Sequence, residues 1–238
     1  MQKIYVRPMS LSYGSNAYNL IKLKKALPIC GNKKLAFSNI EIAIRGKKNK
    51  FKNIDITQIK YLPIKLKKNV LRNIRNITKK RKKILGLDLN KFAIFGVLNV
   101  TPDSFSDGGK FNKFKLAIKR SRQMIHEGAN VIDVGGESTR PGARLISPTQ
   151  EKKRVLDVIS KIKKFNVSID TRKSDVMIAA VKNGAKIIND ISALDFDQKA
   201  LEVVAKLKKP LILNHSQGTP DVMQNNPKYR NVLLDIYD

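Results

Sequence analysis

From Ala93 onward, short apolar runs alternate with longer segments in which apolar residues share one helical face. The short runs predict β-strands, and the longer segments predict amphipathic helices. Single helices between strands favour a parallel sheet with right-handed crossovers. The predicted strands are 93–98, 130–134, 167–170, 186–190 and 210–214, and the predicted helices are 114–129, 147–164, 175–185 and 198–208.

A carboxylate or an amide follows the apolar part of every one of these strands. The five residues are Asn99, Asp133, Asp170, Asn189 and Asn214. In a barrel or an open α/β sheet, ligands bind at the carboxyl ends of the strands. One such residue would be an ordinary turn signal, whereas five in equivalent positions predict a single polar site.

The first 88 residues lack this regular alternation and are rich in lysine and asparagine. They contain helical and strand-like runs, which predict a small domain or an ordered extension. The basic run "TKKRKK" (78–83) is interpreted as a solvated linker. We therefore predict two regions, a basic N-terminal extension with linker at 1–88 and a second domain at 89–238.

The charge of the chain is strongly positive and unevenly distributed. Lysine and arginine total 48 against 19 acids, which gives a net charge of +29, and +20 of this lies in the first 90 residues. A basic arm can meet nucleic acid or anionic lipid. We interpret the excess of positive charge as part of a compositional bias toward Lys, Asn and Ile. No aromatic residue interleaves 78–83 for base stacking, so we expect no sequence-specific nucleic-acid binding.

Three further features of the sequence bear on the cell compartment in which the protein resides. No apolar run reaches the length of a spanning helix, and the N-terminus lacks the apolar core of a signal peptide. Cys30 is the single cysteine, so no internal disulfide is possible. These features predict a cytoplasmic protein without a membrane partner.

Two long motifs carry a family resemblance. "GVLNVTPDSFSDGG" (96–109) and "GANVIDVGGESTRPGA" (128–143) resemble the two signatures of dihydropteroate synthase. "SIDT", "GAKIINDIS" and "NHSQGTP" fall where that family has its next three strand ends, and a weaker resemblance extends to the N-terminal region. The resemblance implies a (β/α)8 TIM barrel. It also implies Mg²⁺-dependent condensation of 6-hydroxymethyl-7,8-dihydropterin diphosphate with p-aminobenzoate to 7,8-dihydropteroate in folate biosynthesis.

The resemblance also assigns roles in the first loop and at the strand ends. Asn99 is implied as a ligand of the Mg²⁺–diphosphate unit, and Asp107 as the group that stabilises the cationic pterin methylene. Phe105 is implied as a wall of the p-aminobenzoate pocket. Asp170 and Asn189 match the residues that bind the pterin ring.

The second loop and the second predicted strand complete the implied site. Thr139 and Arg140 are implied to hold the diphosphate, with Arg140 counted as catalytic, since a hydroxyl beside a guanidinium suits that group. Ser138 precedes them as a further binding residue, and Pro141 helps to shape the amine pocket. Asp133 matches another site aspartate.

The pattern departs from the family after the fifth strand. A complete barrel needs about 250 residues, and the family motifs of strands six to eight are absent from the sequence. We therefore expect a barrel truncated after about five βα units. It could be an inactive fragment, half of a split enzyme whose C-terminal half is encoded separately, or a basic nucleic-acid-binding remnant. Alone it should not make dihydropteroate at a useful rate; a complete barrel could form a homodimer.

Overall fold

The computed structural model describes residues 3–101, 110–138, 145–218 and 226–238, with the backbone alone for 110–113. The chain divides into two compact units. The antiparallel unit comprises Met1–Lys83 together with Arg230–Asp238, and the parallel unit comprises Ile84–Tyr229. The division falls between residues 83 and 84, five residues before our predicted boundary, and it adds the last nine residues of the chain to the first unit.

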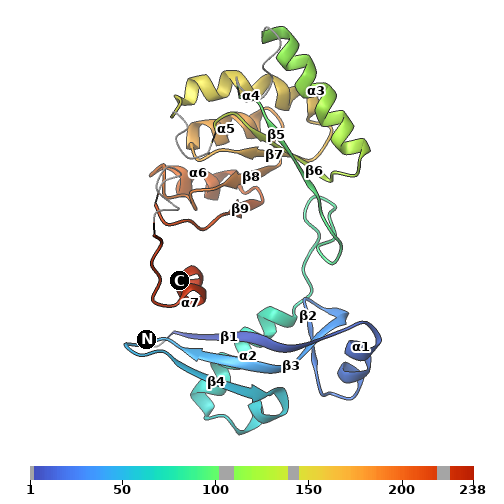
Figure 1. Ribbon diagram of the computed structural model, residues 1–238, viewed down its shortest axis with the longest axis vertical. Coiled ribbons are helices and arrows are strands. Elements are labelled where there is room, and N and C mark those ends of the chain that lie inside the picture. Colours follow the sequence, from blue (N-terminus) through green and yellow to red (C-terminus); the bar gives the residue numbers. More distant parts are fainter. Residues whose placement is uncertain (1–2, 102–109, 139–144, 219–225) are drawn as a thin grey trace. The chain divides into compact units, whose positions relative to one another are not determined.

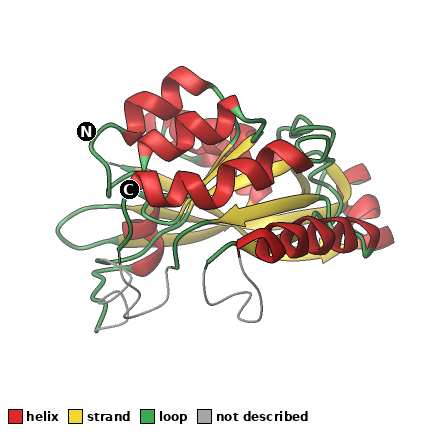
Figure 2. Ribbon diagram, turned by 90° about the horizontal axis from the view of Figure 1, so that it is seen from above, coloured by secondary structure: helices red, strands yellow, loops and turns green. Residues whose placement is uncertain are grey.

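The parallel unit alternates strands and helices, as its sequence pattern predicts. Its five strands are hydrogen-bonded side by side in chain order, and all neighbours are parallel. The alternation can be followed in Figure 1, and Figure 2 shows the same elements coloured by type. The elements are β5 (Phe95–Asn99), α3 (Lys110–His126), β6 (Val131–Gly135), α4 (Pro148–Ile162), β7 (Val167–Asp170), α5 (Ser174–Lys182), β8 (Ile187–Asp190), α6 (Ala200–Leu207) and β9 (Leu211–Leu213).

The helices of this unit cover one face of the sheet. Each helix from α3 to α6 contacts the next one along the chain, so these four helices lie on the same face. One row of strand residues, Leu98, Val134, Ile169 and Ile188, is buried against these helices in the main core. Sequential strand order with helices on one side is the arrangement of a (β/α) barrel, whereas a doubly wound sheet has helices on both faces. The predicted partial barrel is confirmed.

Local sequence signals set the ends of these helices. Ser147 caps α4, since its Oγ accepts from Gln150 N while the Gln150 side chain accepts from Ser147 N. This reciprocal capping box is followed by Pro148 at the first helical position, where a missing N–H costs nothing. Helix α5 ends at Asn183 and Gly184, and Gly184 adopts the positive φ of +115° that glycine tolerates best.

The antiparallel unit is built around one long strand. Its elements are β1 (Ile4–Tyr13), α1 (Gly14–Lys22), β2 (Leu27–Ile29), β3 (Asn32–Ile44), β4 (Lys50–Asp55), the 3-10 helix η1 (Ile56–Tyr61), α2 (Ile64–Thr78) and α7 (Val232–Tyr237). Strand β3 pairs antiparallel with β1, β2 and β4. Alternate residues of β3, including Ile40 and Ile42, pack with Val70 and Ile74 of α2 in a separate core. The first region is therefore a folded unit with its own core.

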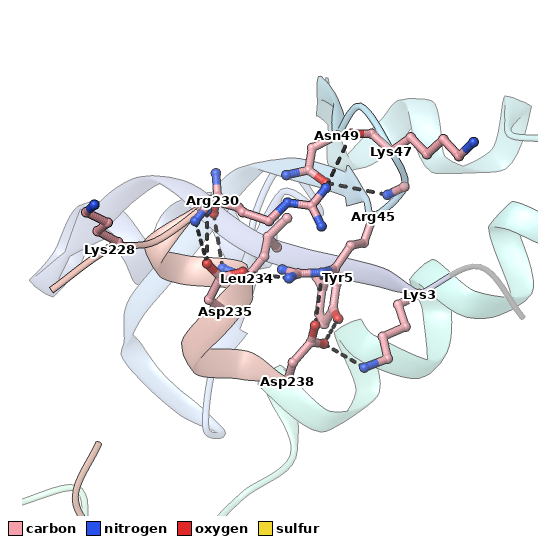
Figure 3. A network of polar contacts seen from close by, with 12 residues as sticks. Lys3, Tyr5, Arg45, Lys47, Asn49, Lys228, Arg230, Leu234, Asp235 and Asp238 are labelled. Carbon is pink, nitrogen blue, oxygen red and sulfur yellow. Dashed lines mark hydrogen bonds and ion pairs between the residues drawn. The ribbon is translucent and has the colours of Figure 1, made fainter. Parts of the chain in front are cut away.

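The segment that contains α7 is fastened to this unit by charged and aromatic side chains (Figure 3). Arg45 donates to Asp235 at 2.6 Å and to Asp238 at 2.9 Å. The Tyr5 hydroxyl also donates to Asp238, and the Tyr5 ring meets Tyr237 edge-on at 5.1 Å. Residues at the two ends of the sequence thus form one compact unit. Within the described ranges, no helix is long and apolar enough to cross a membrane.

Candidate functional site

The polar residues that follow the strands of the parallel unit meet along one row. Asn99 pairs with Gly135, Gly135 with Asp170, and Asp170 with Asn189 across adjacent strands. A Cβ at Gly135 would lie 3.1 Å from Asn99 Oδ1 and 3.5 Å from Asp170 Oδ2. The glycine therefore leaves room for the two flanking side chains to approach each other. Residues of this row alternate with the buried core row and face away from the helices.

Asp133 joins this row from two residues earlier on β6. Asn189 Nδ2 donates to Asp133 Oδ2 at 2.9 Å. The other oxygen, Asp133 Oδ1, is buried and has no hydrogen-bond partner among the residues that the structure describes. Burial raises the pKa of Asp133, and the neighbouring Ser168 hydroxyl and the Asn189 amide oppose that rise. The site therefore contains a desolvated carboxylate whose Oδ1 accepts no hydrogen bond of ordinary geometry from the described residues.

Asp170 is the most strongly perturbed carboxyl of the row. Burial raises its pKa from 3.8 to about 7, and the nearby charge of Asp133 adds to the rise. Glu151, Asp190 and Glu137 contribute in the same direction. A carboxyl group that is half protonated near neutral pH can either donate or accept a hydrogen bond. Perturbed carboxyls that converge in one place are typical of functional sites.

A buried charge network lies behind the strand ends. Lys173 Nζ donates to Glu137 Oε2 at 3.0 Å and to Glu151 Oε2 at 2.6 Å, while Arg172 Nε lies 3.1 Å from Glu137 Oε2. All four side chains are at least nine-tenths buried. Two acids and two bases balance in charge. Such a network is stable only while every member keeps its partner.

Glu137 ties together the loops that carry the candidate site. Burial alone would raise its pKa, but the hydrogen bond from Ile146 N, at 3.0 Å, and the Lys173 and Arg172 charges hold its pKa below the ordinary value. The Arg172 guanidinium also stacks 4.0 Å from the Phe196 ring, in the loop after β8. The network thus links the loops that follow β6, β7 and β8.

Two further aspartates shape the loop after β8. Asp190 is fully buried and accepts from Ser192 N at 2.7 Å and from Leu194 N at 3.1 Å. Asp197 Oδ2 accepts from Ser174 N at 2.8 Å, which caps the start of α5. Hydrogen bonding to Ser174 holds the pKa of Asp197 below its ordinary value. These carboxylates serve backbone geometry, so we assign them no role in binding.

The structure describes some of the remaining predicted site residues but not others. Ser138 is half-buried in the loop after β6. Asn214 follows β9 at the same end of the sheet, and its N–H donates to Asp190 O at 3.2 Å. Five predicted residues lie outside the described residues, so their roles stay predictions: Phe105, Asp107, Thr139, Arg140 and Pro141.

Sequence reasoning missed the charge network behind the site. Glu137 lies inside the second signature motif without an assigned role, and Glu151 stands in the first turn of the predicted helix 147–164, where an acid is common. A signal was present in the run from Glu151 to Val155, because an apolar helix face that begins at Val155 also includes Glu151, one turn earlier. A glutamate on the apolar face of a helix predicts a buried ionic partner.

A known family of enzymes matches the region of the chain that contains the candidate site. The family of pterin binding enzymes matches residues 95–237, which is more than half of the chain. The chain belongs to this family. Among curated relatives, the dihydropteroate synthase of Escherichia coli K12 is 48% identical over 153 residues, which cover 63% of this chain and 54% of the relative. The mitochondrial folate synthesis bifunctional protein of Pisum sativum is 44% identical over 151 residues, covering 60% of this chain and 29% of the relative.

Solved structures of this family share the fold of the parallel unit. The Yersinia pestis dihydropteroate synthase in a sulfonamide complex is 43% identical with a TM-score of 0.58, covering 63% of this chain and 56% of that one. The Xanthomonas albilineans enzyme with 4-aminobenzoic acid is 39% identical with a TM-score of 0.56, covering 63% and 54%. This pterin binding chain spans about half the length of the dihydropteroate synthases that it matches.

Proposed function

We propose that the parallel unit supplies the pterin-binding part of a dihydropteroate synthase. The observation that carries the proposal is the polar row at the strand ends, in which Asp133, Asp170 and Asn189 converge and Asn189 donates to Asp133. The pterin ring presents an amino–amide edge that needs both donors and acceptors. Two carboxylates and one amide supply that combination in a fixed orientation.

The electrostatics of the row support this role. The free acceptor, Asp133 Oδ1, is suited to an N–H of the pterin edge, which would compensate for its buried position. Asp170 is close to half protonated at neutral pH, so it can match either a donor or an acceptor on the ring. Both groups gain from a ligand that replaces the water they have lost.

The diphosphate end of the site is proposed at Asn99, Ser138, Thr139 and Arg140. Among the described residues, no group of three or more His, Cys, Asp or Glu side chains could hold a metal ion. A cation here would therefore take most of its ligands from the diphosphate and from water. Mg²⁺ fits this donor set, since it prefers oxygen ligands and retains several waters. Asn99 would supply an amide oxygen, and the bound ion would offset the negative charge of the leaving pyrophosphate.

The proposed reaction breaks one C–O bond and forms one C–N bond. The p-aminobenzoate nitrogen attacks the pterin methylene carbon, the diphosphate leaves as pyrophosphate, and the new amine loses a proton. In this scheme Asp107 stabilises positive charge on the methylene, and Arg140 stabilises negative charge on the leaving group. Phe105 and Pro141 would orient the amine.

The test is equilibrium binding of 6-hydroxymethyl-7,8-dihydropterin diphosphate to the purified chain by calorimetry, with Mg²⁺ present. Asp133→Ala and Asn189→Ala should each weaken binding by about tenfold or more, equivalent to about 1.4 kcal/mol. Asp157→Ala, an exposed substitution on α4, is the matched control and should leave affinity unchanged. Equal affinities in all variants would refute the proposed pterin site.

Turnover is tested separately, with labelled p-aminobenzoate. The relatives are about twice as long as the matched region, so part of their length has no counterpart in this chain. When several catalytic groups that act together are missing, most of the catalysis is lost. We expect residues 1–238 alone to give no useful turnover, and a separately expressed C-terminal segment of the family to restore it. Turnover of the chain alone within tenfold of a full-length synthase, abolished by Asp170→Ala, would overturn this expectation.

A further inference from the structure

The antiparallel unit carries a large positive charge that its own acids do not neutralise. It holds 24 lysine and arginine residues against four acids. Each of the four acids is engaged within the unit: Glu41 with Arg7, Asp55 with Thr57, and Asp235 and Asp238 with Arg45. Most of the basic side chains therefore have no carboxylate partner among the described residues of this unit. Their summed field favours an anionic partner.

The charge is dense where β3 turns into β4. We call Lys47, Lys48, Lys50, Phe51 and Lys52 the hairpin patch, and all five are exposed. Among the described strands, β4 pairs with β3 alone, so it forms an edge of the sheet. Phe51 pairs with Ala43, while its two neighbouring lysines pair with isoleucines of β3. Successive residues alternate between faces, so lysines and the phenyl ring project from opposite sides of one edge strand.

Protection of an edge strand explains the lysines but not the phenylalanine. Natural sheets place lysine on exposed edges to prevent pairing with another chain. An exposed aromatic residue works against that protection, and Phe51 is 50% exposed. A second exposed ring follows shortly after β4: Tyr61 is 77% exposed, with Lys60 Nζ 4.8 Å from its centroid. Exposed rings and ammonium groups therefore occur together on β4 and on the helix η1 that follows it.

We propose that the hairpin patch binds single-stranded nucleic acid without sequence preference. Its lysines contact phosphates, and Phe51 stacks on an unpaired base. Lysine grooves with aromatic stacking platforms bind single strands in this way, because every base has a stacking face. A duplex hides those faces, and a lipid surface offers no base on which Phe51 could stack. The interaction reads no base edges, in agreement with the expected lack of sequence specificity.

The experiment measures fluorescence anisotropy of a labelled 20-nucleotide oligo-dT with the full chain over a series of salt concentrations. Phe51→Ala should weaken oligo-dT binding by about tenfold, in line with the loss of one stacked base, and leave heparin binding unchanged. The double variant Lys47→Glu/Lys48→Glu should weaken both ligands and reduce the salt slope for oligo-dT by about 1.4, the value for two lost phosphate contacts.

The matched control is Lys208→Glu/Lys209→Glu, an adjacent exposed pair in the parallel unit that changes the net charge equally. It should leave oligo-dT binding nearly unchanged. An equal loss in this control would assign the binding to net charge and overturn the hairpin patch. The proposal also fails if Phe51→Ala affects neither ligand, if a duplex binds as tightly as oligo-dT, or if phosphatidylglycerol vesicles compete better than oligo-dT.

Discussion

The two units use their carboxylates in opposite ways. In the antiparallel unit, whose net charge is +20, none of the four acids is buried and each one fastens neighbouring segments. In the parallel unit, whose net charge is +9, four acids are buried at or behind the strand ends, and Asp170 lies half-buried among them. The two units therefore differ in where their acids are placed as well as in their net charge.

Burial costs a carboxylate its hydration, so a fold keeps several buried acids together only where each is compensated. Lys173 and Arg172 compensate Glu137 and Glu151, whereas Asp133 and Asp170 have no basic partner in the described part of the chain. In the proposed function, a bound pterin would supply the interactions that these two carboxylates lack. The four acids of the antiparallel unit, by contrast, each have a partner within that unit.

The largest effect is expected when the compensated network is broken. Lys173→Met leaves Glu137 without one partner and Glu151 without its only described one. Removing one member of a buried ion pair costs about 3–5 kcal/mol. Urea denaturation of the variant should show this loss of unfolding free energy in the transition of the parallel unit.

The matched control for that substitution is Lys206→Met. Lys206 pairs with Glu202 one helical turn away, but both side chains are more than two-thirds exposed. Water screens such a pair, so the control should unfold almost as the unchanged protein does. Equal losses in the two variants would show that burial does not set the strength of the network.

The sequence predicted the part of this arrangement that follows from periodicity. Strand ends in equivalent positions indicated that Asn99, Asp170 and Asn189 would share one edge, and the register places them in one row. The Glu137–Lys173 pairing could not be predicted in the same way, because it joins residues 36 positions apart through side chains. The packing of residues 230–238 on the antiparallel unit is likewise set by tertiary contacts, which leave no periodic signal in the sequence.

The second largest effect concerns the close approach of β6 to α4, which brings Glu151 under the site. A Cβ at Gly136 would lie 2.7 Å from Val155 Cγ1 and 2.9 Å from Glu151 Cγ. Gly136→Ala should therefore destabilise the parallel unit by about 1–3 kcal/mol, as overpacking generally does. Gly46→Ala is the control, since its nearest neighbour would be an ordinary 3.4 Å away. Calorimetric melting of both variants measures the difference.

A smaller effect follows from the uncompensated carboxyl of Asp170. Its pKa in the folded protein is about 7, above the ordinary value, so the folded state holds a proton that the unfolded state releases. Ionisation then opposes folding, and stability falls as pH rises from about 4 through 7. Asp170→Asn removes this loss. The variant should match the unchanged protein at pH 3 and exceed it by about 1.5 kcal/mol at pH 5, with the difference growing further toward pH 7. Identical melting temperatures at pH 8 would contradict the raised pKa.

The smallest effect is expected where a carboxylate acts only as a fastener. Arg45→Met removes the partner of Asp235 and Asp238, but Leu234 stays buried and Tyr5 still contacts the segment. The segment 230–238 should loosen without global unfolding, which amide hydrogen exchange of its peptides will detect as faster exchange.

Acid should reproduce this loosening. Hydrogen bonds from Arg45 to Asp235, and from Tyr5 and Lys3 to Asp238, hold the pKa of each carboxyl below its ordinary value. Stability from such groups is present above the ordinary pKa and is lost as pH falls through the lowered pKa. Arg7→Met, which frees only Glu41, serves as the control and should not change exchange in 230–238. Acid and Arg45→Met both remove the Arg45 contacts, but acid also weakens the contacts of Lys3 and Tyr5 with Asp238, so the two effects should add only in part. Fully additive loosening would mean that Arg45 does not act through Asp235 and Asp238, and would contradict the role assigned to these acids as fasteners.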